Sequence, residues 1–264
     1  MNVHPDWDAC WGGTGPDDFC RLGVPMAEGA APDFLVWGDS MANSAFAAFD
    51  AYGRDHGEAG FLATAPACAP LAGAGFRVDC IDYNRKILAY LDRAPPMDVF
   101  LMARWSFYSE GYGNIGNTPG QKPLLRPDGT RPEDGFALFA QALEATIARV
   151  AARHRVIVIN HVPDFPASVP KSMLRTLRFG SEPLRVARAD FERRSGRAAA
   201  AVRRIAEAAG ALHVAPYEWF CDADACNYQI DGAPLFIDNV HLGPLGNDML
   251  RQAIEEVLER EGPQ

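Results

Sequence analysis

The sequence predicts an α/β fold, a three-layer α/β/α sandwich with a mostly parallel, doubly wound central sheet. Short apolar runs alternate along the chain with longer segments whose apolar residues recur at helical spacing. The runs at 34–38, 99–103 and 156–159 are apolar at nearly every position, as strands buried on both faces are. Strands and helices that alternate in this way form parallel sheets that helices cover on both sides.

The apolar runs predict the strands, and helical spacing predicts the helices between them. The expected strands are, in chain order, 34–38, 61–64, 99–103, 155–160 and 212–214. Segments with apolar residues at i, i+3 and i+4 are typical of helices. The expected helices are 41–57, 82–93, 136–152, 182–209 and 244–261. Pro95 and Pro96 end the second helix, because proline cannot continue one.

Three segments are expected to lack regular structure. Residues 1–32 contain Gly and Pro without periodicity and form an irregular lead-in, followed by one domain at 33–264. Residues 106–129 are rich in Gly, Asn, Tyr and Pro, and a loop of that length often has a function. A third loop contains Pro163, Pro166 and Pro170. In a parallel sheet, ligands bind beyond the carboxyl ends of the strands, which is where such loops begin.

Composition and charge narrow the class of protein. The chain has 264 residues, 48% of them hydrophobic, which is enough for one α/β domain with a large core. The net charge of −9 argues against a nucleic-acid surface, which needs a basic stripe. No window has the roughly 20 apolar residues of a membrane span, and the first residues lack the pattern of a secretory signal. We therefore expect either a cytoplasmic protein or a piece of a longer one with a membrane region upstream.

The first predicted strand stops at Gly38-Asp39-Ser40. A strand, a tight turn and a helix in this order place the Ser40 hydroxyl at a helix N-terminus. Free N–H groups and the positive end of the helix dipole favour the negative charge that develops when a serine attacks a carbonyl. Ser40 is therefore the candidate nucleophile. The alternative is that Asp39 or Ser40 only caps the helix, a common use of both residue types.

A second motif, Asp238-Asn239-Val240-His241, lies near the C-terminus. A nucleophilic serine needs an imidazole that takes its proton, and a carboxylate that fixes the tautomer of the imidazole. His241 and Asp238 are the candidates for these roles. Taken alone, the motif also fits a turn followed by a helix cap. Its pairing with an early Gly-Asp-Ser is more specific and predicts a Ser-His-Asp triad, which requires the two ends of the chain to lie together.

These two motifs resemble blocks I and V of the SGNH hydrolases, also called the GDSL family. Further segments resemble one branch, the SGNH domain that follows the membrane-embedded acyltransferase-three domain of bacterial surface-polysaccharide O-acetyltransferases. These segments are residues 20–23, 68–71, 99–105 with Tyr108, and 221–226. The resemblance spans most of the chain and implies the SGNH, or flavodoxin-like, form of the predicted fold.

The six cysteines lie in three pairs that are close in sequence. The pairs are Cys10 with Cys20, Cys68 with Cys80, and Cys221 with Cys226. This spacing suits three local disulfides, although six cysteines allow other pairings. Zinc is a rival interpretation, but no Cys-x-x-Cys or His-x₃-His spacing supports it and no metal site is expected. Six reduced thiols are the remaining alternative, whereas disulfides imply an oxidising compartment.

The sequence departs from the wider family at the predicted oxyanion hole. The family pattern has a Gly after the second strand and an Asn after the third, where this chain has Ala65 and Arg104. The backbone N–H of Ser40 can still donate, and Ala65 is one candidate for a second donor. Arg104 either assists electrostatically or is ion-paired. Trp105 and Tyr108 either stack on a sugar or pack inside the domain.

The resemblance implies an O-acetyltransferase domain. The domain is expected to pass an acetyl group through an acyl-Ser40 intermediate to a hydroxyl of a periplasmic or cell-surface polysaccharide, with His241 as the base in both steps. A secreted esterase that acts on carbohydrates or lipids uses the same intermediate and is the first alternative. A non-catalytic glycan-binding module is the second, because the oxyanion Gly and Asn are missing.

The resemblance also implies the partners and the location. No cofactor is expected, because an N-terminal membrane acyltransferase domain in a longer parent protein supplies the acetyl group. The acceptor is a glycan of the lipopolysaccharide, exopolysaccharide or peptidoglycan type, and no nucleic acid is bound. On this interpretation residues 1–32 link the chain to the missing membrane domain. The chain then works in the periplasm or outside the cell, tethered to the inner membrane.

Overall fold

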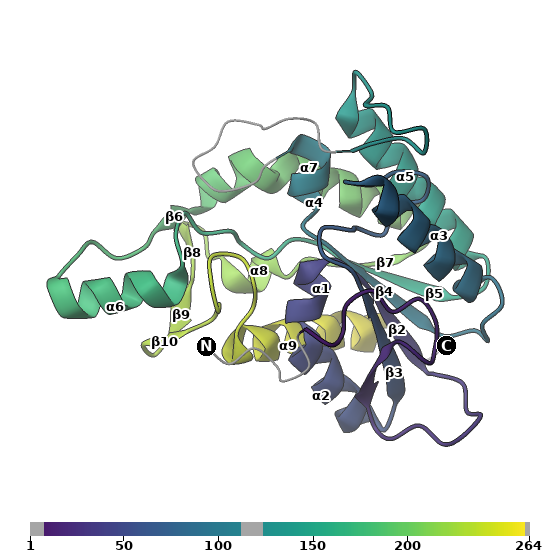
Figure 1. Cartoon of the computed structure of the whole chain (residues 1–264). Coiled ribbons are helices and arrows are strands. Elements are labelled where there is room, and N and C mark those ends of the chain that lie inside the picture. The colour runs from purple at the N-terminus through teal and green to yellow at the C-terminus, as the bar shows by residue number, and fades with distance from the viewer. Residues whose placement is uncertain (1–7, 112–123, 262–264) are drawn as a thin grey trace.

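A computed structural model describes residues 8–111 and 124–261 of the chain. Within them, a twisted central sheet lies between two layers of helices (Figure 1). The prediction of a three-layer sandwich with a mostly parallel sheet is confirmed. The middle of the expected loop at 106–129 falls outside the described residues.

The main sheet of the described chain has the strand order β1-β3-β2-β4-β5-β7. Its parallel strands are β2 Phe34–Gly38, β3 Ala59–Thr64, β4 Asp98–Met102, β5 Arg155–Ile159 and β7 Leu212–Val214. One edge strand, β1 Cys20–Gly23, pairs antiparallel with β3. Two small antiparallel sheets lie apart from the main one: β6 Val186–Ala187 with β8 Ala225–Cys226, and β9 Gln229–Ile230 with β10 Ala233–Pro234.

Helices cover both faces of the sheet. They are α1 Ser40–Ser44, α2 Phe46–His56, α3 Val78–Leu91, α4 Trp105–Glu110, α5 Gly135–Ala151, α6 Val169–Phe179, α7 Arg188–Ala208, α8 Tyr217–Phe220 and α9 Pro244–Glu261. The helices α1, α2 and α9 lie on one face, and α3, α5 and α7 lie on the other (Figure 1). In contrast to these, α6 projects from the body of the domain.

Successive residues of β2 supply the two cores on opposite faces of the sheet. Phe34 and Val36 belong to the cluster beneath α2 and α9, where Phe34 packs edge-on against Tyr52. Leu35 and Trp37 belong to the cluster beneath α3 and α5. All four β2 side chains are fully buried. A strand with apolar residues at every position therefore serves both layers, as the sequence pattern predicted.

Part of the lead-in that was expected to be irregular has regular structure and pairs with the main sheet. Cys20–Gly23 form β1 at the edge of the main sheet. The N–H of Gly12 also donates to the carbonyl of Thr64 at the end of β3, at 2.8 Å. Apolar periodicity could not predict β1, because Leu22 is the only one of its four residues that is buried.

Two helices form where loops were expected. The helix α4 extends into the segment 106–129, and α6 follows Pro163 and Pro166 and includes Pro170. Pro170 lies in the first turn of α6, where the N–H that proline lacks has no helical partner anyway. A proline that ends one helix can therefore begin another, and composition alone does not distinguish the two cases.

Three predicted helices have different bounds in the structure. The helix expected at 82–93 is α3, which begins four residues earlier, at Val78. The helix expected at 41–57 consists of α1 and α2, which are separated at Ala45. The helix expected at 182–209 begins at Arg188 instead. The residues immediately before it form β6, which pairs with β8. The pairing of β6 with β8, which lies almost 40 residues later in the chain, therefore replaces the start of the predicted helix.

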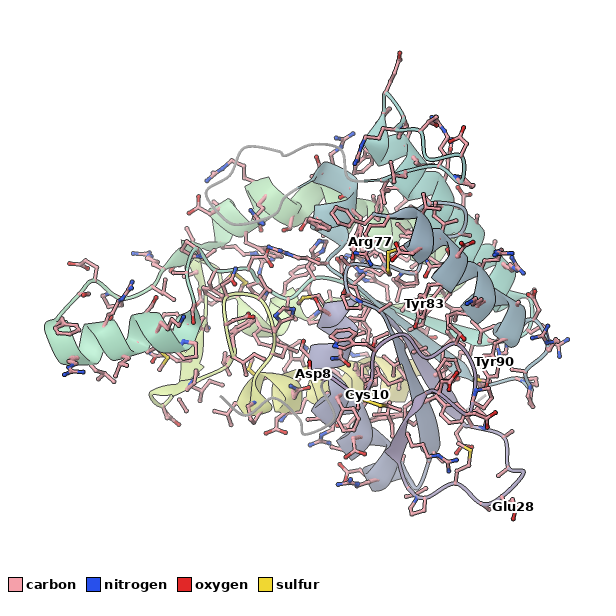
Figure 2. All side chains as sticks on the ribbon, viewed as in Figure 1. Asp8, Cys10, Glu28, Arg77, Tyr83 and Tyr90 are labelled. Carbon is pink, nitrogen blue, oxygen red and sulfur yellow. A yellow bond between two sulfur atoms is a disulfide. The ribbon has the colours of Figure 1, made fainter. Side chains whose placement is uncertain are left out.

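All six cysteines lie in the described residues and are joined as their spacing suggested. The disulfides are Cys10–Cys20, Cys68–Cys80 and Cys221–Cys226. Figure 2 labels Cys10 in the first pair and shows the second pair beside Arg77. The first pair ties the lead-in to β1, and the second ties the loop after β3 to the first turn of α3. Both pairs therefore hold loops close to the sheet.

Gly38 allows β2, β4 and α1 to approach one another closely. A Cβ at this position would lie 1.9 Å from the carbonyl oxygen of Met102 and 2.6 Å from the Cβ of Ala42. No side chain fits between these atoms without a shift of the backbone. The glycine of the Gly-Asp-Ser motif therefore brings the start of α1 against the carboxyl end of β4.

We expect Gly38→Ala to lower the free energy of unfolding by about 3 kcal/mol, because the added methyl overpacks a rigid backbone contact. Urea denaturation of the variant and the wild type measures the difference. Gly196→Ala on α7 is the matched control, since its Cβ would meet nothing closer than 3.9 Å. The control should be neutral or more stable by up to about 1 kcal/mol. Equal stability of Gly38→Ala and the wild type would contradict the close-approach argument.

Candidate active site

The candidate site lies at the point where the chain changes direction across the sheet. The strand β2 pairs with β3 on one side and with β4 on the other. Loops that follow two such strands diverge, and doubly wound sheets bind their ligands at this switch point. Ser40 follows β2 and Arg104 follows β4, so both lie where the sequence placed them.

Asp39 joins the two loops at the switch point. Its carboxylate caps α1 by accepting the N–H of Met41 at 2.8 Å. The other carboxylate oxygen accepts the backbone N–H of Arg104 at 3.2 Å and the hydroxyl of Tyr108 at 2.7 Å. Burial raises the pKa of Asp39, although these three donors stabilise the charged form. Asp39 therefore connects the loops, and its oxygens are already occupied by donors.

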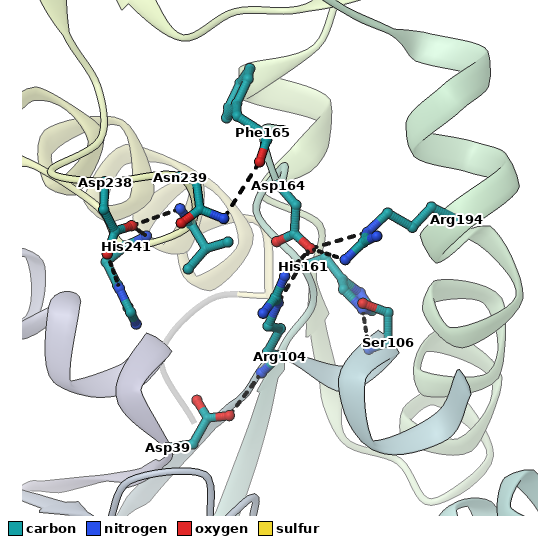
Figure 3. A network of polar contacts seen from close by, with 11 residues as sticks. Asp39, Arg104, Ser106, His161, Asp164, Phe165, Arg194, Asp238, Asn239 and His241 are labelled. Atoms are coloured by element: carbon teal, nitrogen blue, oxygen red, sulfur yellow. Dashed lines mark hydrogen bonds and ion pairs between the residues drawn. The ribbon is translucent and has the colours of Figure 1, made fainter. Parts of the chain in front are cut away.

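Ser40, His241 and Asp238 form a continuous chain of hydrogen bonds. The Nε2 of His241 lies 2.8 Å from the Oγ of Ser40, a residue 201 positions away in the sequence. The Nδ1 of the same ring lies 2.7 Å from Oδ2 of Asp238 (Figure 3). The structure thus brings together the three residues that the sequence nominated as a triad.

The environment of Asp238 determines which ring nitrogen of His241 carries the proton. Burial opposes the charge of Asp238, but the hydrogen bond and charge of His241, together with the backbone N–H groups of Val240 and His241, lower its pKa to about 2. The ionised carboxylate can only accept, so Nδ1 of His241 carries a proton and donates it. The Nε2 is then the acceptor for the hydroxyl of Ser40. This arrangement suits a general base that removes the serine proton.

The segment after β5 holds the Asp238–His241 segment in position. The N–H of Phe165 donates to the carbonyl of Asn239 at 2.8 Å, and the N–H of Val169 donates to the carbonyl of Asp238 at 2.9 Å. Figure 3 also shows the side chain of Asn239 directed at Phe165. The loop that precedes α6 is therefore a support for the acid and base of the site.

Asn247 of α9 joins the two ends of the chain. Its Nδ2 donates to the carbonyl of Ser44 at 3.0 Å, and its Oδ1 accepts the N–H of Ala48 at 3.1 Å. The side chain is buried, and its partners lie around 200 positions earlier in the sequence. These bonds align the start of α9 with the junction of α1 and α2. They therefore place His241 and Ser40 on elements that are fixed to each other.

Asp164 binds two arginines beside the switch point (Figure 3). One of its oxygens accepts from Arg104 at 2.8 and 3.2 Å and from Arg194 at 2.9 and 3.2 Å. The three side chains are 6 to 17% exposed. Arg104 is therefore an ion-paired arginine, which was one of its two expected roles. The cluster ties the loops after β4 and β5 to α7.

Three other residues nominated from the sequence have structural contacts. The N–H of Ala65 donates to the carbonyl of Gly38 at 3.3 Å and is therefore engaged within the turn. The rings of Trp105 and Tyr108 are almost completely buried. The indole N–H of Trp105 donates to a main-chain carbonyl of β5, and the hydroxyl of Tyr108 donates to Asp39. Neither ring reaches the surface, so of the two expected alternatives the rings pack inside the domain and do not form a sugar-stacking platform.

His161 is a buried, neutral imidazole behind the site. Its Nε2 accepts the N–H of Ser106 at 2.7 Å, so its proton is on Nδ1, which donates to Oδ1 of Asn160 at 2.6 Å. Burial lowers the pKa of His161 to about 4, and two nearby arginines add to this effect. A second proton on Nε2 would face the N–H of Ser106. His161 therefore holds the start of α4 only in its neutral form.

The sequence did not reveal the roles of Asp164 and Arg194, or that the hydroxyl of Tyr108 donates to Asp39. A signal for Asp164 existed, since it follows a parallel strand at the same edge of the sheet as Ser40 and Arg104. Arg194 gave no signal, because α7 contains several arginines and most of them face solvent. Which of them turns inward depends on where α7 packs.

We expect His161 to make stability fall as the pH drops from 6.5 towards 4. Above pH 6.5 the ring is neutral in the folded and the unfolded chain. Below it, the unfolded chain binds a proton that the folded chain does not bind until about pH 4. This residue alone should lower the free energy of unfolding by about 2 kcal/mol between pH 7.5 and pH 5.

Urea denaturation at these two pH values measures the effect. His161→Gln should lose about 2 kcal/mol of the pH dependence, whereas the partly exposed His56→Gln should keep it. An unchanged pH dependence in His161→Gln would show that the buried ring is not the source.

Two kinds of feature are absent from the described residues. Residues 8–111 and 124–261 contain no group of three or more His, Cys, Asp or Glu side chains that could hold a metal ion. The same residues include no helix with the length and apolar character needed to cross a bilayer.

Comparison with known proteins gives two findings that agree with this geometry. A family model described as "SGNH domain (fused to AT3 domains)" matches residues 5–256. The solved periplasmic domain of a lipopolysaccharide acetyltransferase from Salmonella ser. Paratyphi A is 20% identical in sequence. It matches with a TM-score of 0.61, over 86% of this chain and 83% of that one. This similarity shows that the two proteins share a fold.

A GDSL-like lipase from Bacteroides thetaiotaomicron VPI-5482 is a further structural match. It is 14% identical, has a TM-score of 0.44, and the alignment covers 91% of this chain and 93% of that one. No curated protein matches the sequence significantly.

Proposed function

Because the chain belongs to the family of SGNH domains fused to AT3 domains, we propose that it is an O-acetyltransferase domain. It passes an acetyl group through an acyl-Ser40 intermediate to a hydroxyl of a periplasmic or cell-surface polysaccharide. The observation that carries the proposal is the chain of hydrogen bonds from Ser40 through His241 to Asp238. The shared fold with a lipopolysaccharide acetyltransferase periplasmic domain supports the choice of a glycan acceptor.

In the first step, Ser40 takes the acetyl group from an activated acetyl ester or thioester. Nε2 of His241 removes the hydroxyl proton as Oγ forms a bond to the acetyl carbon. The tetrahedral intermediate collapses, the bond to the leaving group breaks, and His241 returns the proton to that group. Asp238 remains ionised throughout and stabilises the charged imidazole. The product is an acetyl ester on Ser40 and a neutral His241.

In the second step, the same base works on the acceptor. His241 removes the proton of a sugar hydroxyl, whose oxygen attacks the acetyl carbon of the ester on Ser40. The bond from the acetyl carbon to Oγ then breaks, and His241 returns the proton to Ser40. Water in place of the sugar gives hydrolysis by the same steps. A domain that transfers acetyl groups should therefore also show slow esterase activity.

The start of α1 provides the main oxyanion stabilisation. The backbone N–H of Ser40, at the first position of the helix, has no helical acceptor to bond. The helix dipole adds a positive field at the same point. Asp39 accepts the N–H of Met41, and the N–H of Ser40 is a donor that can serve the reaction. This proposal needs neither the Gly nor the Asn of the wider family.

The setting that we propose is extracytoplasmic. Three disulfides are typical of proteins that fold in an oxidising compartment. The family description couples this domain to an AT3 domain, which we propose as the membrane-bound source of acetyl groups. The acceptor is then a polysaccharide that the domain meets at the outer side of that membrane.

We expect Ser40→Ala to lower kcat/KM for 4-nitrophenyl acetate by a factor on the order of 10³ or more, because the nucleophile is lost. Release of 4-nitrophenol, followed by absorbance, measures the rate. The control is Ser181→Ala, which removes an exposed hydroxyl and should leave the rate unchanged. A rate in Ser40→Ala equal to that of the wild type would exclude an acyl-Ser40 intermediate.

Adding oligosaccharide acceptors distinguishes a transferase from an esterase. Mass spectrometry of the products should detect glycans that have gained one acetyl group, in amounts that depend on Ser40. Hydrolysis that depends on Ser40 without any acetylated glycan, across lipopolysaccharide, exopolysaccharide and peptidoglycan fragments, would favour the esterase.

We expect Asp238→Asn to lower kcat by a factor on the order of 10⁴, because the amide N–H group of Asn can donate to Nδ1 and so favour the tautomer that carries its proton on Nε2. The control is Asp231→Asn, an exposed residue in a turn outside the site. Thermal unfolding of both variants shows whether the fold is retained. Full activity in a folded Asp238→Asn would show that the carboxylate does not orient His241.

A further inference from the structure

The helix α6 has an apolar side that begins in the core and continues beyond the edge of the domain. Val169 is fully buried, and Met173, one turn later, packs partly against the core. Leu177 follows at the same helical spacing but is 82% exposed, and its neighbour Leu174 is 60% exposed. The rest of the domain therefore covers the start of this apolar side but leaves its C-terminal part exposed.

The adjoining side of α6 is basic and has no acidic partner. Lys171, Arg175 and Arg178 lie on it, and no Asp or Glu occurs between residues 165 and 181. None of the three forms an ion pair with another described residue, whereas Arg188 and Arg203 of α7 pair with glutamates. This cluster of positive charge is found on a chain whose net charge is −9.

We propose that α6 binds the surface of an anionic lipid bilayer. Leu174 and Leu177 would enter the boundary between headgroups and acyl chains, while the three basic side chains would meet the lipid phosphates. A basic amphipathic helix with exposed leucines is the kind of segment that lies in this interface. Long basic side chains can also extend away from the apolar side towards the headgroups.

The composition of α6 favours a bilayer over a protein partner. Protein interfaces rely on Trp, Tyr and Arg anchors in matched pockets, and leucine is under-represented among those anchors. Val169–Phe179 contains two arginines but neither Trp nor Tyr. Charges of a single sign beside flexible leucines instead suit a fluid surface that has no fixed shape. The projection of α6 from the domain leaves its far end accessible to such a surface (Figure 1).

Binding through α6 would also orient the candidate active site. Val169 begins the helix, and its N–H donates to the carbonyl of Asp238. An 11-residue helix spans about 16 Å. The acid of the triad would therefore lie roughly one helix length from the contact with the lipid. The proposal does not depend on the proposed function, because vesicle binding can be measured without catalysis.

Sedimentation with phospholipid vesicles tests the proposal. The wild-type protein should bind phosphatidylcholine vesicles that contain phosphatidylglycerol and bind pure phosphatidylcholine at least tenfold more weakly. High salt should weaken the binding, because it screens the attraction between the basic side chains and the phosphates. Ser40→Ala should bind as the wild type does, which separates a failure of this proposal from a failure of the proposed activity.

Variants of α6 identify the residues that bind. Leu174→Ser with Leu177→Ser should weaken binding at least tenfold through the loss of apolar contact. Arg175→Gln with Arg178→Gln should weaken it about 25-fold, at about fivefold for each charge. The matched controls are Ile230→Ser, 43% exposed, and Arg54→Gln with Arg85→Gln, which remove the same number of charges elsewhere. Neither control should change the affinity.

Leu177→Trp provides an independent readout. Its fluorescence should shift to shorter wavelength when anionic vesicles are added, because the ring enters a less polar environment. The proposal is overturned if the wild type does not bind anionic vesicles, if α6 variants and controls bind equally well, or if no shift occurs. Binding to a detergent-solubilised membrane acyltransferase domain, without binding to vesicles, would also overturn it in favour of a protein partner. Thermal unfolding of each variant confirms that it is folded.

Discussion

The contact between Ser40 and His241 depends on two distant parts of the chain being packed against each other. The buried side chain of Asn247 bonds to the main chain at the junction of α1 and α2. The packing of α9 against α2 then fixes the segment that leads into α9. The hydrogen bond of 2.8 Å is therefore a result of core packing on this face of the sheet. Without that packing, the Gly-Asp-Ser motif and the Asp238–His241 motif would not meet.

The site contains two carboxylates whose environments give them different roles. Asp39 is buried and surrounded by donors from three residues, so burial raises its pKa while its oxygens connect the two loops. Asp238 is more exposed, and the donors around it lower its pKa to about 2. The negative charge of Asp238 thus stays beside the imidazole of His241. Asp164 is a third carboxylate, and it ties the neighbouring loops together by binding two arginines.

Much of the fold could be predicted from local patterns. The apolar runs at β2, β4 and β5 identified the centre of the sheet, because strands buried on both faces leave a continuous signal. The strand β1 and the helix α6 could not be predicted in this way. The strand β1 has a single buried residue, and most of the apolar residues of α6 are exposed. Tertiary pairing forms β1, whereas α6 has a proline in its first turn, and composition associates proline with loops.

The sequence by itself indicated the order of the main strands and helices, suggested the cysteine pairs, and contained the three residue types that a serine-based site requires. These are properties of spacing and chemistry that the chain carries before it folds. Only the tertiary structure decided which groups meet. It paired Arg104 with Asp164, gave the hydroxyl of Tyr108 to Asp39, and took Trp105 out of reach of any sugar. The physical reason is that burial and hydrogen-bond partners depend on how helices pack on the sheet, which no local pattern records.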